Sequence, residues 1–178
     1  MTSLVQKVIE IAVHFEAAGV PYAFGGALAL AYCTEDPRGT RDIDVNAFLP
    51  ATHPDPALAA LPPGVLVPED SAARIVAEGQ VRLWWDDTPV DLFLDYAPLH
   101  RQAAEGSRDV PFAGRQIRVL GPVEIVLFKA LFDRPQDWVD ISTVVGADAV
   151  DRDRVEHDLV ALVGDDDPRV ARWRTLLG

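Results

Sequence analysis

The sequence predicts an α/β protein with a mixed β-sheet flanked by helices and a helical C-terminal part. Two observations lead to this prediction. Short β-rich segments, some of them with alternating apolar and polar residues, recur up to about residue 120. Beyond that point the apolar residues recur at helical spacing. We therefore expect a core over residues 1–120 and a helical part over residues 121–178 that packs on it, together forming one compact domain.

The first elements alternate between helix and strand. Residues 3–19 predict a helix, with Ser3 as its N-cap and Gly19 at its end. The segment "PYAF" predicts a short strand that enters a glycine turn, and "ALALAYC" predicts a helix packed behind it. Residues 42–48, "DIDVNAF", alternate as a strand with one apolar face does.

The middle of the chain predicts a connection and two hairpins. Residues 49–64 contain five prolines, which favour a surface connection. Residues 81–96 predict a hairpin, because "DDTP" is typical turn chemistry between two β-rich runs. Residues 109–120 predict a second hairpin. Four helical segments follow, over residues 123–133, 136–146, 150–164 and 168–177, with Pro135 separating the first two.

Composition narrows the possible function classes. Apolar residues make up 49% of the 178 residues, but no apolar run is long enough to cross a bilayer, and the N-terminal segment shows no export signal. The single cysteine, Cys33, excludes an internal disulfide and fits a reducing compartment. We therefore expect a cytoplasmic protein without a membrane partner. The net charge of −12 argues against broad binding of a nucleic-acid backbone.

Two aspartates on the predicted strand 42–48 indicate a metal site. Asp42 and Asp44 are two residues apart, so their side chains point to the same face of a strand. Two adjacent carboxylates repel each other and lose hydration unless a cation lies between them. A hard divalent ion, Mg²⁺ or Mn²⁺, prefers such oxygen ligands and leaves room for substrate phosphates. An exposed strand edge is the alternative interpretation of the pair.

A glycine turn and a third aspartate extend this site. Gly25 and Gly26 open the predicted helix, where backbone N–H groups can cradle a phosphate, although such a pair alone is also typical of a plain turn. Asp91 is an isolated carboxylate within the apolar run "PVDLFLD". It could bind a second ion or act as a base toward an attacking hydroxyl. Together these residues predict metal-assisted handling of a nucleoside triphosphate.

The order of these motifs resembles a known superfamily. Gly25-Gly26, "RGTRDIDV" and "VDLF" are similar to the signature of the DNA polymerase β-like nucleotidyltransferases. With "VLGPVEIVLFKALFDRPQDWVDI" added, the pattern resembles the AbiEii/MenT-like branch of toxin nucleotidyltransferases, over roughly residues 20–145. The resemblance implies a nucleotidyltransferase core in which Gly25 and Gly26 hold the triphosphate. Asp42 and Asp44 would bind the metal, and Asp91 would complete the site.

The resemblance also implies roles for charged residues outside the strands. Lys129 would reach the triphosphate, and Arg38 and Arg41 would contact the substrate or the leaving pyrophosphate. Asp137 would orient Lys129 or a nearby arginine. From the residues alone, a lysine on an amphipathic helix and an acid at a helix start are also ordinary surface features.

The expected activity is transfer of a nucleoside monophosphate from an NTP to an acceptor hydroxyl, with Mg²⁺ as cofactor. The acceptor stays open between a tRNA 3′ end, a protein and a small molecule. The family-level expectation is a toxin with a cognate antitoxin as partner. The alternatives are a non-catalytic module that senses nucleotide or docks an antitoxin, and a metal-dependent phosphohydrolase.

Overall fold

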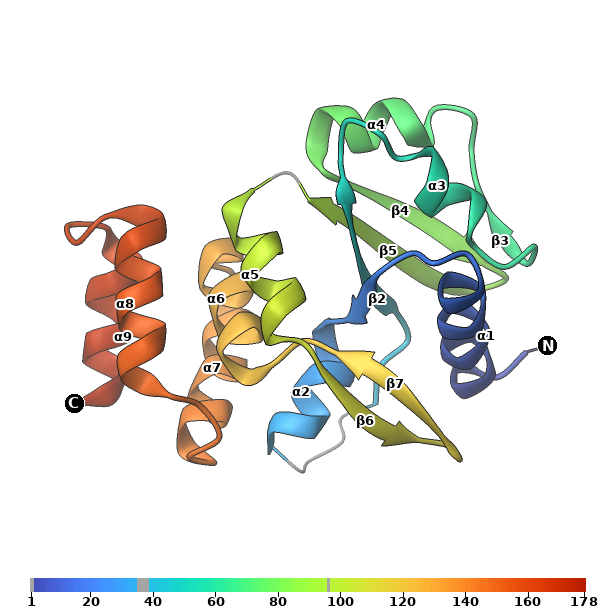
Figure 1. Ribbon diagram of the computed structural model, residues 1–178. Helices are drawn as coiled ribbons and strands as arrows, with labels where there is room; N and C mark the ends of the chain where they lie inside the picture. Colours follow the sequence, from blue (N-terminus) through green and yellow to red (C-terminus); the bar gives the residue numbers. More distant parts are fainter. Residues whose placement is uncertain (1, 35–38, 96) are drawn as a thin grey trace.

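The computed structural model describes residues 2–34, 39–95 and 97–178 (Figure 1). In this part of the chain, seven strands form one mixed sheet in the order β3-β4-β5-β2-β1-β7-β6. The strands are β1 Tyr22–Phe24, β2 Ile43–Pro50, β3 Val65–Leu66, β4 Gln80–Trp85, β5 Thr88–Asp95, β6 Arg108–Phe112 and β7 Arg115–Val119. The predicted α/β class with a mixed sheet is confirmed.

The centre of the sheet combines two kinds of pairing. β2 runs parallel to β5 and antiparallel to β1, and β1 runs parallel to β7. Both predicted hairpins are present, β4 with β5 and β6 with β7. Burial alternates along β5, where Val90, Leu92 and Leu94 are fully buried and the residues between them are half-buried. One face of the central sheet is therefore core, and the other remains partly open.

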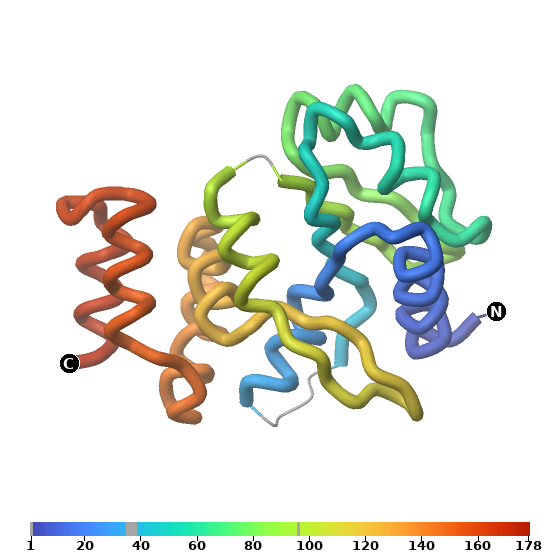
Figure 2. The backbone as a smooth tube through the Cα atoms, viewed as in Figure 1, coloured from blue at the N-terminus to red at the C-terminus, as the bar shows by residue number. Residues whose placement is uncertain are grey.

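The helices lie around this sheet (Figures 1 and 2). In the views of both figures, α8 and α9 form the outermost layer, and α5, α6 and α7 lie between them and the sheet. Helix α1 lies near the opposite end. The helices are α1 Leu4–Ala17, α2 Gly26–Thr34, α3 Asp55–Ala59, α4 Ser71–Glu78, α5 Pro98–Gly106, α6 Pro122–Phe132, α7 Pro135–Gly146, α8 Arg152–Val163 and α9 Pro168–Leu177.

Helix α6 is the central helix of this layer, since it contacts α2, α5, α7 and α8. Its sequence, "PVEIVLFKALF", is apolar on nearly every side, as expected for a helix surrounded by others. Pro122 occupies the first turn, where no intrahelical N–H bond is needed, and Asp133 ends the helix in the left-handed conformation. Pro135 then begins α7, as predicted.

Helix α1 is tied to the β4–β5 hairpin by a buried lysine. Lys7 is 1% exposed, and its Nζ donates to the Trp85 carbonyl at 2.7 Å and to Thr88 Oγ1 at 3.0 Å. Asp86, at the hairpin turn, adds an ion pair at 3.2 Å. Ser3 caps the helix as predicted. These contacts fix the hairpin that carries Asp91.

The expected surface connection over residues 49–64 is wrong in part. This segment contains α3, and apolar side chains along it are buried, among them Ala51, Ala57, Ala60 and Leu61. Prolines are tolerated in the first turn of a helix, so the proline content did not exclude one. Helices α4 and α5 were not predicted, although each has its apolar residues on one face. No helix in the described part of the chain has both the length and the hydropathy to cross a bilayer.

Candidate active site

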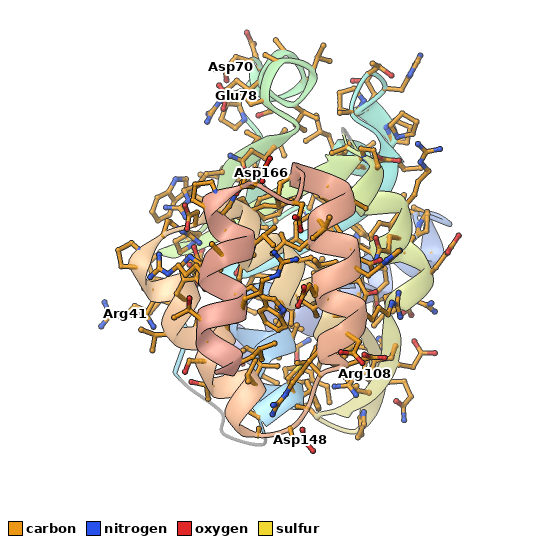
Figure 3. The ribbon with its side chains drawn as sticks, turned by 90° about the vertical axis from the view of Figure 1, so that its left-hand side faces the viewer. Arg41, Asp70, Glu78, Arg108, Asp148 and Asp166 are labelled. Carbon is orange, nitrogen blue, oxygen red and sulfur yellow. The ribbon has the colours of Figure 1, made fainter. Side chains whose placement is uncertain are left out.

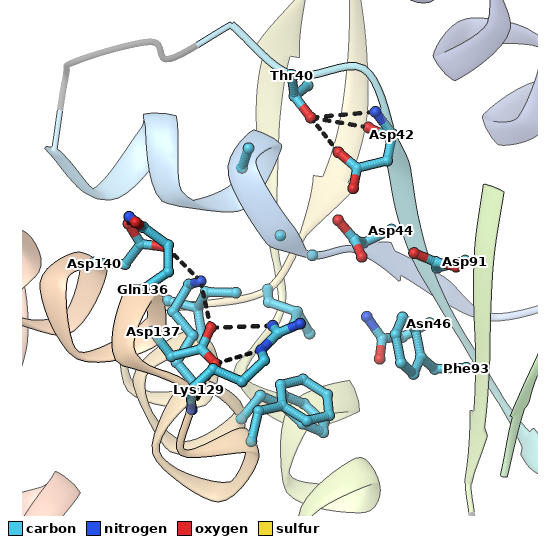
Figure 4. A pocket seen from close by; sticks show the side chains of 18 of the residues that line it. Thr40, Asp42, Asp44, Asn46, Asp91, Phe93, Lys129, Gln136, Asp137 and Asp140 are labelled. Atoms are coloured by element: carbon cyan, nitrogen blue, oxygen red, sulfur yellow. Dashed lines mark hydrogen bonds and ion pairs between the residues drawn. The ribbon is translucent and has the colours of Figure 1, made fainter. Parts of the chain in front are cut away.

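Strands β2 and β5 bring the predicted carboxylates together. Asp44 and Asp91 are register partners on these parallel strands, and Asp42 lies directly before β2. The prediction placed Asp42 within the strand, but β2 begins at Ile43 because the chain turns at Thr40, whose hydroxyl donates to Asp42 Oδ1 at 2.5 Å. All three aspartates line one cavity of about 540 Å³ (Figure 4).

Asp44 is a buried carboxylate with a perturbed pKa. Its pKa is raised to about 6, chiefly by burial and in addition by the nearby charges of Asp42 and Asp91. Lys129 and Arg134 oppose this shift only in part. The protein therefore compensates the charge of ionised Asp44 only in part. A divalent cation beside it would supply that compensation.

The glycine turn lies against Asp44. The Gly25 N–H donates to the Asp44 carbonyl at 2.9 Å, and Gly26 begins α2 with a φ of +51°. A Cβ on Gly26 would lie 1.9 Å from Asp44 Oδ2, so only glycine fits there. The first backbone N–H groups of α2 thus lie next to the carboxylates. This arrangement suits an anion that is bound to a metal.

Lys129 and two aspartates form the opposite wall of the cavity (Figure 4). Lys129 Nζ donates to Asp140 Oδ2 at 2.7 Å and to Asp137 Oδ1 at 3.3 Å. Arg134 Nε also donates to Asp137, at 2.7 Å. Burial alone would raise the pKa of Asp137, but Arg134 and Lys129 outweigh it and lower that pKa. Asp137 thus contacts both Lys129 and an arginine, which is the geometry predicted for it, while the role stays a prediction.

Arg82 is a site residue that the sequence reasoning missed. Its Nε donates to Asp91 Oδ1 at 2.7 Å and its Nη2 donates to Asp91 Oδ2 at 2.6 Å. The signal was present in the hairpin, because Trp85 pairs with Thr88 across the turn and counting outward pairs Arg82 with Asp91. No three acidic, histidine or cysteine side chains in the described residues converge as a ready-made metal cage. Asp91 is held by Arg82 instead.

The other predicted site residues lie at the rim or outside the described part. Arg41 lines the same cavity and projects outward from the edge of the molecule (Figure 3). Arg38 lies outside the described residues. The cavity also has an apolar side that was not predicted, made of Phe93, Leu120, Ile125, Phe128 and Phe132.

The sequence matches no model of a known protein family and no curated protein. Solved structures do resemble it. ANT(2'')-Ia in complex with adenylyl-2''-tobramycin superposes with a TM-score of 0.63 at 17% identity, over 98% of each chain. A nucleotidyltransferase-like protein from Paracoccidioides brasiliensis gives a TM-score of 0.53 at 14% identity, over 98% of this chain and 86% of that one.

A third solved structure also has a similar fold. The lincosamide antibiotic adenylyltransferase LnuA, bound to lincomycin, has a TM-score of 0.53 at 17% identity, over 79% of this chain and 96% of its own. The chain has the nucleotidyltransferase fold. The predicted superfamily is supported at the level of this fold, and the AbiEii/MenT-like branch stays a prediction.

Within this nucleotidyltransferase fold, the predicted residues separate into two groups that face each other across the cavity. The three aspartates lie on the sheet side, with Gly25 and Gly26 against Asp44, and Lys129 and Asp137 lie on the helical side. The roles assigned to these residues remain predictions.

Proposed function

We propose that the protein is a metal-dependent nucleotidyltransferase that moves a nucleoside monophosphate from an NTP to a hydroxyl of a small molecule. The observation that carries the proposal is the pairing of Asp44 with Asp91 beside the glycine turn that opens α2. Negative charge and backbone N–H groups meet at this point, which suits a metal-bound triphosphate.

The sheet side of the cavity would hold the NTP. Asp42 and Asp44 would bind Mg²⁺ or Mn²⁺, which supplies Lewis-acid polarisation of the phosphates when it is bound. The backbone N–H groups at Gly25 and Gly26 would hold the triphosphate oxygens. Lys129 and Arg41 would neutralise charge on the leaving pyrophosphate. Asp137 would keep Lys129 in position through the contact at 3.3 Å.

Asp91 would serve the acceptor. In the proposed step the acceptor oxygen forms a bond to the α-phosphorus, the bond from that phosphorus to the pyrophosphate oxygen breaks, and Asp91 takes the hydroxyl proton. Asp91 must exchange its two hydrogen bonds with Arg82 for this role. The structure with the Arg82–Asp91 ion pair is therefore not the reactive state.

A small-molecule acceptor is supported by two observations. ANT(2'')-Ia and LnuA, which share the fold over most of their length, are bound to an adenylylated antibiotic and to an antibiotic, respectively. The net charge of −12 also disfavours a nucleic-acid acceptor with a broad contact surface. A tRNA 3′ end, a protein acceptor and a toxin role with an antitoxin partner are the competing outcomes.

A second candidate is a nucleotide-sensing module without catalysis. The observation that favours it is that Asp91 and Lys129 are both engaged by other side chains, Asp91 by Arg82 and Lys129 by Asp137 and Asp140. In such a module these ion pairs would persist when nucleotide binds.

Label transfer from α-³²P NTPs tests both candidates. Each of the four NTPs would be incubated with Mg²⁺ and, in parallel, with a pool of small metabolites, total RNA or cell protein. We expect label in a small molecule, with loss of that label in Asp44→Asn. Label in RNA or protein would replace the proposed acceptor class. Nucleotide binding without transfer or hydrolysis would favour the sensing module, and free nucleotide without labelled acceptor would indicate a hydrolase.

A further inference from the structure

A second cavity adjoins the first at the carboxylates of Asp44 and Asp91. It has a volume of about 340 Å³ and shares six residues with the first cavity: Asp44, Arg82, Asp91, Phe93, Phe132 and Arg134. From there it extends along β4 to Arg74 and Glu78 on α4. Gly25, Gly26 and Lys129 do not line it. We call this cavity the α4 groove.

The α4 groove carries unused positive charge. The Arg74 side chain makes no hydrogen bond or ion pair with the residues that the structure describes, and Glu78 is the one acidic residue that joins it on α4. Arg82 follows on β4, with 54% of its side chain exposed although it is bound to Asp91. Arg134 is a third guanidinium group in the lining, which also contains the carboxylates of Asp44, Glu78 and Asp91. Arg82 is bound to Asp91 and Arg134 to Asp137, which leaves Arg74 for a ligand.

The position of the α4 groove matches what an acceptor needs. In the proposed function, the triphosphate lies at the glycine turn, so the leaving pyrophosphate points toward α2. In-line displacement requires the attacking oxygen to enter from the side opposite the leaving group. The α4 groove shares Asp44 and Asp91 with the first cavity but not the glycines, so an acceptor in it would approach Asp91 away from the glycine turn.

We propose that the α4 groove binds the acceptor and that Arg74 selects an acceptor that carries an anionic group, a phosphate or a carboxylate. The inference rests on the proposed function and adds the chemical class of the acceptor to it. Guanidinium groups bind both anions through paired hydrogen bonds. The apolar rings of Phe93 and Phe132, 6.3 Å apart, would contact the carbon skeleton of the acceptor.

An anionic acceptor would also act on the ion pair at Asp91. The Arg82 guanidinium holds Asp91 through two hydrogen bonds, and an anion in the α4 groove offers that guanidinium a second partner. Asp91 would then be available to the acceptor hydroxyl. A polycationic acceptor would instead meet Arg74, Arg82 and Arg134 as like charges, and it would compete with Arg82 for Asp91.

Direct binding tests the inference without catalysis. Ribose 5-phosphate, ribose, glucuronate, glucose and tobramycin would be titrated into the metal-free protein by calorimetry. We expect ribose 5-phosphate or glucuronate to bind more tightly than its uncharged counterpart, and the preferred member distinguishes phosphate from carboxylate. Arg74→Gln should weaken that binding at least about tenfold. Arg101→Gln is the matched control, because Arg101 is an exposed helical arginine outside the groove.

The binding and transfer results together decide between the proposed acceptor class and the proposed function. Equal binding by wild type and Arg74→Gln, or binding of tobramycin alone, would overturn the inference. Label transfer in the presence of Mg²⁺ and NTP separates the two proposals. If Arg74→Gln transferred label to every acceptor as well as wild type does, the proposed function would stand, but the proposal of an anionic acceptor would be wrong. Binding of the anion that depends on Arg74, with no transfer or nucleotide binding, would support the groove and remove the proposed function.

Discussion

Asp44 on β2 and Asp91 on β5 are register partners on adjacent parallel strands. The backbone pairing of the two central strands therefore places two carboxylates next to each other, and Asp42 adds a third at the start of β2. Such an arrangement is unfavourable in the free protein, because burial and like charge both oppose ionisation of Asp44. The fold thus contains a locally unstable point that a bound cation would relieve.

Replacement of Asp44 by asparagine should stabilise the metal-free protein. The pKa of Asp44 is raised from 3.8 to about 6, so its ionised form is unfavourable above pH 6. We expect Asp44→Asn to raise the free energy of unfolding by about 1–3 kcal/mol at pH 8. Urea denaturation in EDTA measures this change. Asp166→Asn, in the exposed loop between α8 and α9 (Figure 3), is the control and should change little. A less stable Asp44→Asn variant would contradict the electrostatic account.

The metal response should depend on pH. Between pH 3.8 and about 6 the folded protein keeps a proton on Asp44 that the unfolded chain has lost. The stability contributed by this proton is present at low pH and is lost as pH rises through about 6. Mg²⁺ needs the ionised carboxylate, so the increase in Tm on adding Mg²⁺ should grow across the same window. Thermal denaturation with and without Mg²⁺ from pH 5 to 8 measures it, and a Tm increase that is constant over this range would count against Asp44 as a ligand.

Gly26→Ala should damage both stability and nucleotide binding. The new Cβ would lie 1.9 Å from Asp44 Oδ2, and the φ of +51° is unfavourable for alanine. We expect a loss of at least about 1 kcal/mol and a matching loss of NTP affinity, measured by denaturation and calorimetry.

Gly146→Ala is the matched control for this substitution. A Cβ at Gly146 meets no atom within 4 Å, and this glycine ends helix α7. Its stability should be unchanged or slightly higher. If Gly26→Ala and Gly146→Ala changed stability and NTP affinity equally, the contact between Gly26 and Asp44 would have no specific role.

Lys129→Met should destabilise the helical wall of the site. The substitution removes the cation between Asp137 and Asp140, and among the described residues Asp137 then keeps only its contacts with Arg134. Loss of one partner from a buried ion pair lowers stability by about 3 kcal/mol. Lys129→Arg should lose less, because the charge is kept. If Lys129→Met were as stable as wild type and bound NTP equally well, Lys129 would have neither role.

The sequence was sufficient to predict which carboxylates form the site, but not all of the side chains that contact them. Spacing and alternation identified Asp44 and Asp91, because both depend on local strand geometry. Arg82 could have been found by counting residues from the hairpin turn. The contact of Lys129 with Asp137 was expected from the resemblance alone, and its contact with Asp140 was not predicted, because it depends on how α6 packs against α7. Helix α3 was obscured by its prolines, whose effect depends on position within a helix.

The two lysines of the chain have a practical consequence. Among the 16 basic residues, only Lys7 and Lys129 carry a side-chain amine, and both are buried in ion pairs. Amine-reactive reagents should therefore modify the side chains of the folded protein slowly. The acylation rate at Lys7 would report how often α1 separates from the β4–β5 hairpin. The rate at Lys129 would report opening of the candidate active site, so protection of Lys129 by a nucleotide would serve as a chemical footprint of occupancy.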